Sequence, residues 1–110
     1  MTTPEQFQAY LDSPEGRQLE FKQATNRYPF EEMVKYCVAL ANEGGGTMLL
    51  GVTDTRPRTV VGTSAFQEPG RTEAGLFEQL RQRIVVEEYV HEGKRVLIIH
   101  VPSRLPGTAW

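Results

Sequence analysis

The stretch from Ala39 to Asp54, ALANEGGGTMLLGVTD, constrains the fold more than any other part of the chain. An apolar pattern with helical spacing reaches Asn42 and stops at three consecutive glycines, Gly44–Gly46. Glycine ends helices because it adopts left-handed backbone conformations at little cost. An apolar run follows at once, from Met48 to Val52, and such a run is typical of a central strand covered on both faces. The chain is therefore expected to turn from a helix directly into the middle of a sheet.

Residue patterns predict the other elements in the same way. We expect helices that begin at Pro4, Phe30 and Thr72 and that end before Ser13, at Asn42 and at Ile84, respectively. We expect strands over residues 18–22, 46–53, 59–62, 85–91 and 95–101, with the last two joined as a hairpin through Glu92–Gly93–Lys94. This order indicates the α+β class, with a small, mostly antiparallel sheet and helices on one of its faces.

The helix over residues 30–42 is expected to supply much of the core. Its predicted buried side chains are Val34, Cys37, Val38 and Ala41, packed against Leu49, Val52 and Leu97 or Ile99. The later helix is expected to point Leu76, Phe77, Leu80 and Ile84 inward.

Length and charge limit what the chain can do. With 110 residues it is expected to form one domain over 1–110, and it contains no apolar run long enough to cross a membrane. The lone cysteine, Cys37, has no disulfide partner in the chain, which favours a reducing, cytoplasmic setting. The formal net charge of −2 argues against a strongly basic nucleic-acid module, but a local arginine patch can still bind phosphates. The candidates for such a patch are Arg56, Arg58, Arg71, Arg81 and Arg83.

Acidic residues are placed where they can form a metal site. Glu20 lies on the polar side of one predicted strand, and Asp54 follows another. Glu15 precedes the first of these strands by a few residues. If the two strands are neighbours, these carboxylates converge, and Mg²⁺ or Mn²⁺ would relieve their repulsion and activate a water for phosphodiester cleavage. Lys22 could add charge stabilisation. The alternative is that all three acids are solvated or form turns.

The glycine run allows two interpretations. It could cradle a phosphate, but it lacks the spacing and the lysine of a phosphate-binding loop, and it follows a helix instead of preceding one. A helix cap followed by a tight turn is therefore the preferred interpretation.

Several of these segments together resemble Schlafen-type domains, also called AlbA-like or divergent AAA domains. The resemblance covers about Pro14 to Arg104 and rests on Glu15, on LEFK at Leu19–Lys22, on the stretch from Ala39 to Asp54 and on Val61–Gly62. It implies an α+β domain associated with RNA or DNA. It also implies that Glu15, Glu20 and Asp54 correspond to the metal-binding carboxylates of those family members that cleave tRNA or rRNA.

The resemblance leaves two functions open. One is a nucleic-acid-binding domain with a metal-dependent endoribonuclease site, and the other is a non-catalytic DNA-binding or partner-binding module of a larger transcriptional regulator. Family domains usually continue past the point where this chain stops at Trp110, which would make the chain truncated at its C-terminus. Active members pair two lobes around a basic groove. We therefore expect a homodimer that brings together two sets of Arg56, Arg58, Arg81 and Arg83.

Overall fold

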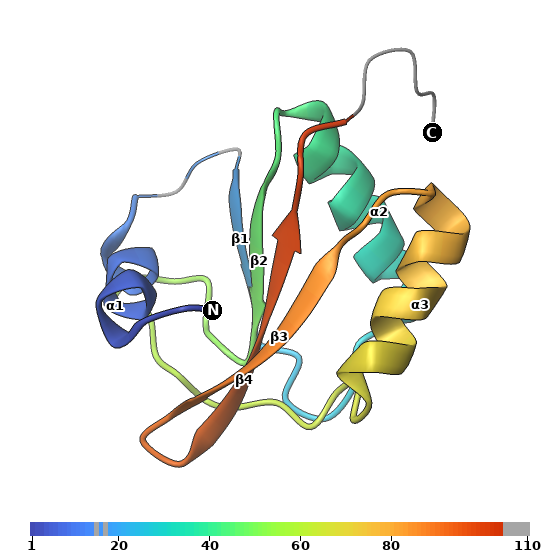
Figure 1. Ribbon diagram of the computed structural model, residues 1–110. Coiled ribbons are helices and arrows are strands. Elements are labelled where there is room, and N and C mark those ends of the chain that lie inside the picture. The colour runs from blue at the N-terminus through green and yellow to red at the C-terminus, as the bar shows by residue number, and fades with distance from the viewer. Residues whose placement is uncertain (15, 17, 105–110) are drawn as a thin grey trace.

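The computed structural model describes residues 1–14, 16 and 18–104, which form three helices and four strands (Figure 1). The helices are α1 (Pro4–Asp12), α2 (Phe30–Asn42) and α3 (Pro69–Leu80), and the strands are β1 (Leu19–Lys22), β2 (Gly46–Leu50), β3 (Val85–His91) and β4 (Lys94–Val101). The α+β class is confirmed. No helix of this described part is long and apolar enough to cross a membrane.

The ends of the first two helices follow from local chemistry. Thr3 and Gln6 form a capping box at the start of α1, in which each side chain accepts a hydrogen bond from the other residue's backbone N–H. Helix α2 ends as predicted: the N–H of Gly45 donates to the Leu40 carbonyl at 2.8 Å, and both Gly44 and Gly45 have a φ of +97°. The glycines therefore cap a helix, and no phosphate-binding role is needed to explain them.

The sheet has the order β1-β2-β4-β3. Strand β1 runs parallel to β2, because α2 carries the chain back between them. Strand β4 is antiparallel to both of its neighbours, β2 and β3. The sheet is therefore mostly antiparallel, and β1 and β3 are its edges.

The prediction that helices cover one face is wrong, because both faces are covered. Helices α2 and α3 pack on one face, and α1 packs on the other (Figure 1). The single fully buried side chain of α1 is Phe7, which is clustered with Phe21 and Leu49 and stacks on Tyr89 with ring centroids 4.6 Å apart. Phe7, Tyr10 and Leu11 give α1 an apolar side, but a helical pattern does not say which face of a sheet that side covers.

The core predicted for α2 needs a related correction. Cys37 and Ala41 are buried as expected, together with Met33 and Leu40, but Val34 and Val38 are only partly buried. Strand residues alternate between faces, so α2 contacts the side of the sheet that carries Met48, Leu50, Leu97 and Ile99. The predicted partners Leu49 and Val52 lie in the cluster under α1 instead.

Several element boundaries also differ from the prediction, by one residue at the starts of β1 and β4 and by more in β2 and α3. Strand β2 stops at Leu50, because Gly51 has a φ of +99° and turns the chain. In place of the strand expected over 59–62, the described structure has an isolated bridge between Val52 and Val60. Helix α3 begins at Pro69, which is a favourable first helical residue, and ends at Leu80. Its residue Phe77 is 48% exposed and does not point inward.

The N-terminal segment is hydrogen-bonded to the face of the sheet that α1 covers. The backbone N–H and the hydroxyl of Thr2 each donate to the carboxylate of Glu87 at 2.8 Å. Nε2 of His100 lies 2.8 Å from Oε1 of the same carboxylate. Burial by itself would raise the pKa of Glu87, but the hydrogen bonds from His100 and Thr2 outweigh it and hold this pKa below the usual glutamate value.

The hydrogen-bonded carboxylate of Glu87 predicts how the stability of the fold depends on pH. A lowered folded-state pKa means that ionised Glu87 stabilises the fold above the unfolded pKa, about 4.3 for glutamate, and that this stabilisation is lost as the pH falls through the folded value. We therefore expect Glu87→Gln to lower the melting temperature at neutral pH and to reduce its decline in acid. Melting curves at several pH values measure this, and parallel declines in both proteins would contradict the role assigned to the carboxylate.

Candidate functional site

The two strands that carry the predicted acidic site are neighbours, as the sequence analysis required. Strands β1 and β2 are parallel, and Glu20 is aligned with Met48. Because Met48 belongs to the cluster under α2 and α3, the alternation of side chains places Glu20 and Lys22 on that same face.

Lys22 contacts Tyr36 of α2. Its ammonium nitrogen lies 4.6 Å from the centre of the Tyr36 ring. A hydrogen bond with Tyr36 raises the pKa of Lys22 above its usual value, although partial burial opposes that shift. Burial raises the pKa of Tyr28, and the nearby Tyr36 raises it further. Lys22 therefore stays charged and is already engaged by neighbouring side chains.

Asp54 lies in an exposed loop that is hydrogen-bonded to the end of α1. Nη2 of Arg56 donates to the carbonyl of Asp12 at 3.0 Å. Nη1 of Arg58 donates to the carbonyls of Leu11 and Ser13 at 3.0 and 2.6 Å. The Asp54 loop thus follows the α1 side of the molecule, whereas Glu20 belongs to the α2 side.

Arg58 has a structural role that its sequence position did not reveal. The residue is 9% exposed, and its guanidinium carbon lies 4.0 Å from the centre of the Phe21 ring. Nε and Nη2 are buried without a hydrogen-bond partner, so stacking on the ring is their main compensation. A group enclosed in this way is not available to an external phosphate.

The described residues do not by themselves form a metal centre. Among residues 1–14, 16 and 18–104, no three Asp, Glu, His or Cys side chains are grouped closely enough to hold an ion. Glu15, the third predicted carboxylate, lies outside the described residues. The site of Glu15, Glu20 and Asp54 therefore stays a prediction. Cys37 is not a metal ligand candidate either, because burial raises the pKa of its thiol to about 12.

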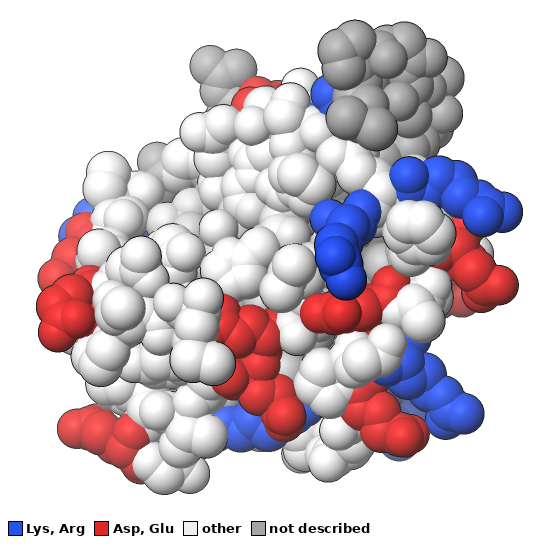
Figure 2. Space-filling view, viewed as in Figure 1, with Lys and Arg blue, Asp and Glu red and all other residues white. Residues whose placement is uncertain are grey.

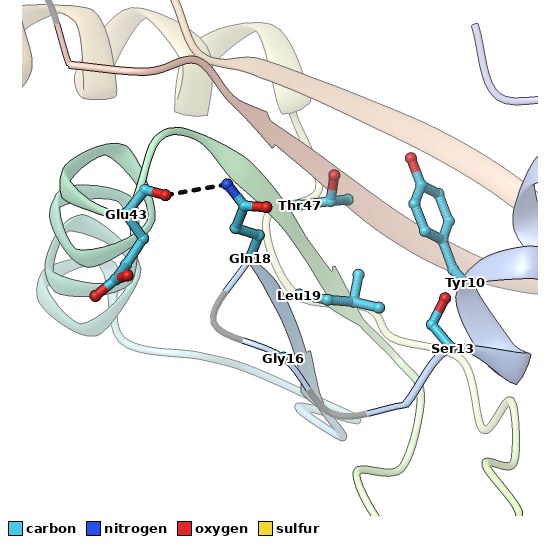
Figure 3. A pocket seen from close by; sticks show the side chains of 7 residues that line it. All are labelled: Tyr10, Ser13, Gly16, Gln18, Leu19, Glu43 and Thr47. Atoms are coloured by element: carbon cyan, nitrogen blue, oxygen red, sulfur yellow. Dashed lines mark hydrogen bonds between the residues drawn. The ribbon is translucent and has the colours of Figure 1, made fainter.

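A groove of about 660 Å³ lies between α1 and the turn from α2 to β2 (Figure 3). Its described lining residues are Tyr10, Ser13, Gly16, Gln18, Leu19, Glu43 and Thr47. The side-chain amide of Gln18 lies at the α2 end of the groove and donates to the Glu43 carbonyl at 3.0 Å. No basic side chain is among these lining residues, so they offer no charge for binding phosphate.

A different surface gathers exposed arginines. Arg81 follows the last residue of α3, and Arg83 lies two residues farther along. Between them, Nε2 of Gln82 donates to the Ser103 carbonyl at 2.6 Å, which brings the segment that contains exposed Arg104 to the same end of the sheet. Figure 2 shows basic side chains at the upper right, over this end of α3. We call Arg81, Arg83 and Arg104 the arginine surface.

Unlike Arg71 and Arg95, which pair with Glu68 and Glu88, these three arginines have no acidic partner in the described part of the chain. In the described part of the chain, none of the three guanidinium groups forms an ion pair or a side-chain hydrogen bond. By contrast, Arg71 at the other end of α3 is paired with Glu68 at 3.3 Å. Unpaired exposed cations at one end of a domain are suited to an anionic ligand.

Sequence reasoning missed Arg104 and the exposure of Phe77. Phe77 and Arg83 line a groove of about 450 Å³ along α3. The helical pattern contained the signal for Phe77: Thr72, Leu76 and Leu80 form the buried stripe of α3 at spacings of four residues, and Phe77 lies beside that stripe. Arg104 lay in a segment without periodicity, and only the Gln82–Ser103 contact reveals its neighbours.

The chain is similar in sequence to one described protein family. Residues 15–108 match the model of the family described as Schlafen, AlbA_2. That match includes the sheet, α2 and α3 and begins after α1. No curated protein sequence matches the chain.

Two solved structures have a similar fold. The DIP2311 protein from Corynebacterium diphtheriae superposes with a TM-score of 0.66 at 19% sequence identity, over 91% of this chain and 25% of that protein. The chain thus spans about a quarter of the length of DIP2311. The N-terminal domain of a RecG-related protein from Nitrosomonas europaea, described as a candidate ATP-dependent DNA helicase, gives 0.58 at 24% identity, over 92% of this chain and 84% of that domain.

Proposed function

Because the chain belongs to the Schlafen AlbA_2 family, we propose that it is a nucleic-acid-binding domain and that the arginine surface contacts the phosphate backbone. The observation that carries this proposal is the grouping of Arg81, Arg83 and Arg104, exposed and without acidic partners in the described chain, at one end of the sheet. The helicase-related description of the Nitrosomonas protein agrees with the same class of ligand.

Physical reasons favour this surface over the other candidates. Phosphate contacts supply much of the affinity for nucleic acid, and arginine binds phosphate oxygens through a planar set of donors. Arg56 and Arg58 are already engaged with the end of α1, so they are less available. The overall charge of −2 makes a local, unpaired cluster more important than the total.

The test replaces two of these arginines. We expect Arg81→Ala combined with Arg83→Ala to weaken binding of a fluorescein-labelled RNA by about tenfold or more, and to reduce the salt dependence of log K by about one for each lost phosphate contact. Fluorescence anisotropy at several salt concentrations gives both quantities. Arg71→Ala is the control, because it removes an arginine from α3, the helix that precedes the arginine surface, and this arginine is already paired with Glu68.

Each outcome of that titration decides the proposal. Equal losses for the double variant and for Arg71→Ala would indicate a non-specific effect of charge and would overturn the assignment to this surface. A wild-type protein that binds neither RNA nor DNA at low salt would end the nucleic-acid proposal altogether. A partner-binding module of a larger regulator would then be the better account.

A more specific proposal is that Glu15, Glu20 and Asp54 bind Mg²⁺ or Mn²⁺ and cleave the bound RNA. This proposal depends on membership of the family. It is supported by the adjacency of β1 and β2 and by the presence of Lys22 on the same strand face as Glu20. A metal would supply an activated water and stabilisation of the leaving oxygen. Denaturing gels of the RNA recovered from the same titration, run with and without Mn²⁺, distinguish binding alone from cleavage.

Self-association is also a proposal. Strands β1 and β3 are both sheet edges, which is compatible with pairing between copies, and β3 exposes Val85 and Val90. A homodimer would present two arginine surfaces to one strand of nucleic acid. Light scattering on the samples used for the titration measures whether two copies are present when RNA binds.

A further inference from the structure

An exposed aromatic ring lies beside the arginine surface. Phe77 is 48% exposed near the C-terminal end of α3, and the backbone N–H of Arg81 donates to its carbonyl at 2.7 Å. One exposed apolar side chain is ordinary on a protein surface. Phe77 differs because it forms one wall of a groove of about 450 Å³ whose lining also contains Arg83.

The floor of this groove is open and apolar. Its lining residues are Gly70, Glu73, Ala74, Phe77, Arg83 and Ile84. Gly70 and Ala74 are one helical turn apart and leave space next to the ring; a methyl group added at Gly70 would meet no atom within 4 Å. The buried side chain of Ile84 closes the inner side.

Among the described residues that line the groove, the one acidic side chain, Glu73, is already hydrogen-bonded. Oε2 of Glu73 accepts a hydrogen bond from the backbone N–H of Val86 at 2.7 Å, which orients this carboxylate toward the start of β3. Arg83 has no acidic partner in the described chain. The groove therefore combines a flat apolar face with a free positive charge.

We propose that this groove binds an unpaired nucleobase stacked on Phe77, so that the ligand of the arginine surface is single-stranded nucleic acid. The inference rests on the proposed function and specifies its substrate class. Bases within a duplex are stacked on one another and offer no free face to a side chain, whereas an unpaired base stacks on an aromatic ring regardless of its sequence. Arg83 lies in the same groove and holds the phosphate of the stacked nucleotide.

The experiment compares a single strand with a duplex. We expect Phe77→Ala to weaken binding of a labelled oligouridylate by about tenfold, the loss typical of one stacked base, and to leave binding of a labelled RNA duplex unchanged. Phe77→Trp should retain the affinity for the single strand, because tryptophan provides an equally flat face. Since Phe77 is about half exposed, the melting temperature of each variant confirms that the fold is intact.

A second variant tests the groove without touching the ring or an arginine. Ala74→Leu fills the space beside Phe77 with a side chain that helices tolerate well. We expect it to lower the affinity for oligouridylate to the same degree as Phe77→Ala, again with no effect on the duplex.

Two results would overturn the inference and leave the proposed function standing. In one, Phe77→Ala binds oligouridylate as tightly as the wild type while the Arg81 and Arg83 double variant loses affinity, so that the surface contacts backbone alone. In the other, Phe77→Ala weakens single strand and duplex equally, so that the ring supports the arginines instead of stacking on a base. If the wild type binds neither ligand, the proposed function has failed, and this inference fails with it.

Discussion

Gly46→Ala is expected to destabilise the domain by about 3 kcal/mol, at the upper end of the usual cost of forcing extra volume into a packed site. A methyl group at this position would lie 2.5 Å from the carbonyl oxygen of Gln18 and 2.9 Å from Cδ2 of Leu40. The first of these atoms belongs to the backbone at the start of β1, so it cannot move away without disturbing the pairing of β1 with β2. The N–H of Thr47 donates to the same Gln18 carbonyl at 3.0 Å, and that hydrogen bond would be strained as well.

Gly70→Ala is the matched control, because it adds the same methyl group in open space. Nothing lies within 4 Å of that position, and the residue is in the first turn of α3. Alanine has the higher helix propensity, so the control should be neutral or more stable by up to about 1 kcal/mol. Guanidinium denaturation measures both variants. Similar midpoints for the two would show that the close approach at Gly46 does not limit stability.

Phe7→Ala is expected to have the other large effect, a loss of about 4 kcal/mol, as for other buried aromatic residues truncated to alanine. The ring is 1% exposed and stacks on Tyr89, and its centroid lies 5.0 Å from that of His91. Because it is the only fully buried side chain of α1, its removal leaves the helix attached mainly through the Thr2–Glu87 hydrogen bonds and through Arg58.

Hydrogen exchange shows where that stability is lost. The amides of α1 should exchange much faster in Phe7→Ala, together with those of neighbouring residues in the cluster with Phe21 and Leu49. Gln8→Ala, next to it on the exposed side of the helix, should change the free energy of unfolding by less than about 0.5 kcal/mol. Unchanged protection of α1 in Phe7→Ala would mean that the helix is not anchored by this ring.

The predictable part of the fold was the part with strong local signals. The three glycines after Asn42 indicated the end of α2 and the start of β2, because backbone constraints there are local. The hairpin of β3 and β4 was predicted from alternation and from its turn at Glu92 and Gly93, whose φ values are +49° and +78°. Each of these features depends on a few adjacent residues.

The remaining features depend on tertiary contacts. Val34 and Val38 match a helical stripe as well as Met33 and Leu40 do, and only the position of the sheet decides which pair is buried. Sequence spacing likewise could not separate Arg58, which is stacked on Phe21 and enclosed, from Arg81 and Arg83, which are exposed. Residue type alone predicted all of these arginines as phosphate contacts. The burial of Arg58 in the structure excludes it and leaves the exposed Arg81 and Arg83.

The place of β4 in the sheet has a consequence for synthesis of the chain. Strand β4 is the last of the described strands in sequence, yet it lies between β2 and β3 and contributes Leu97 and Ile98 to the two opposite clusters. On the ribosome, β2 emerges about half a chain length before its partner, and contacts so distant in sequence form slowly. Until residue 101 leaves the exit tunnel, neither cluster can close, and the bare edge of β2 and its apolar side chains are accessible to chaperones and to other nascent chains.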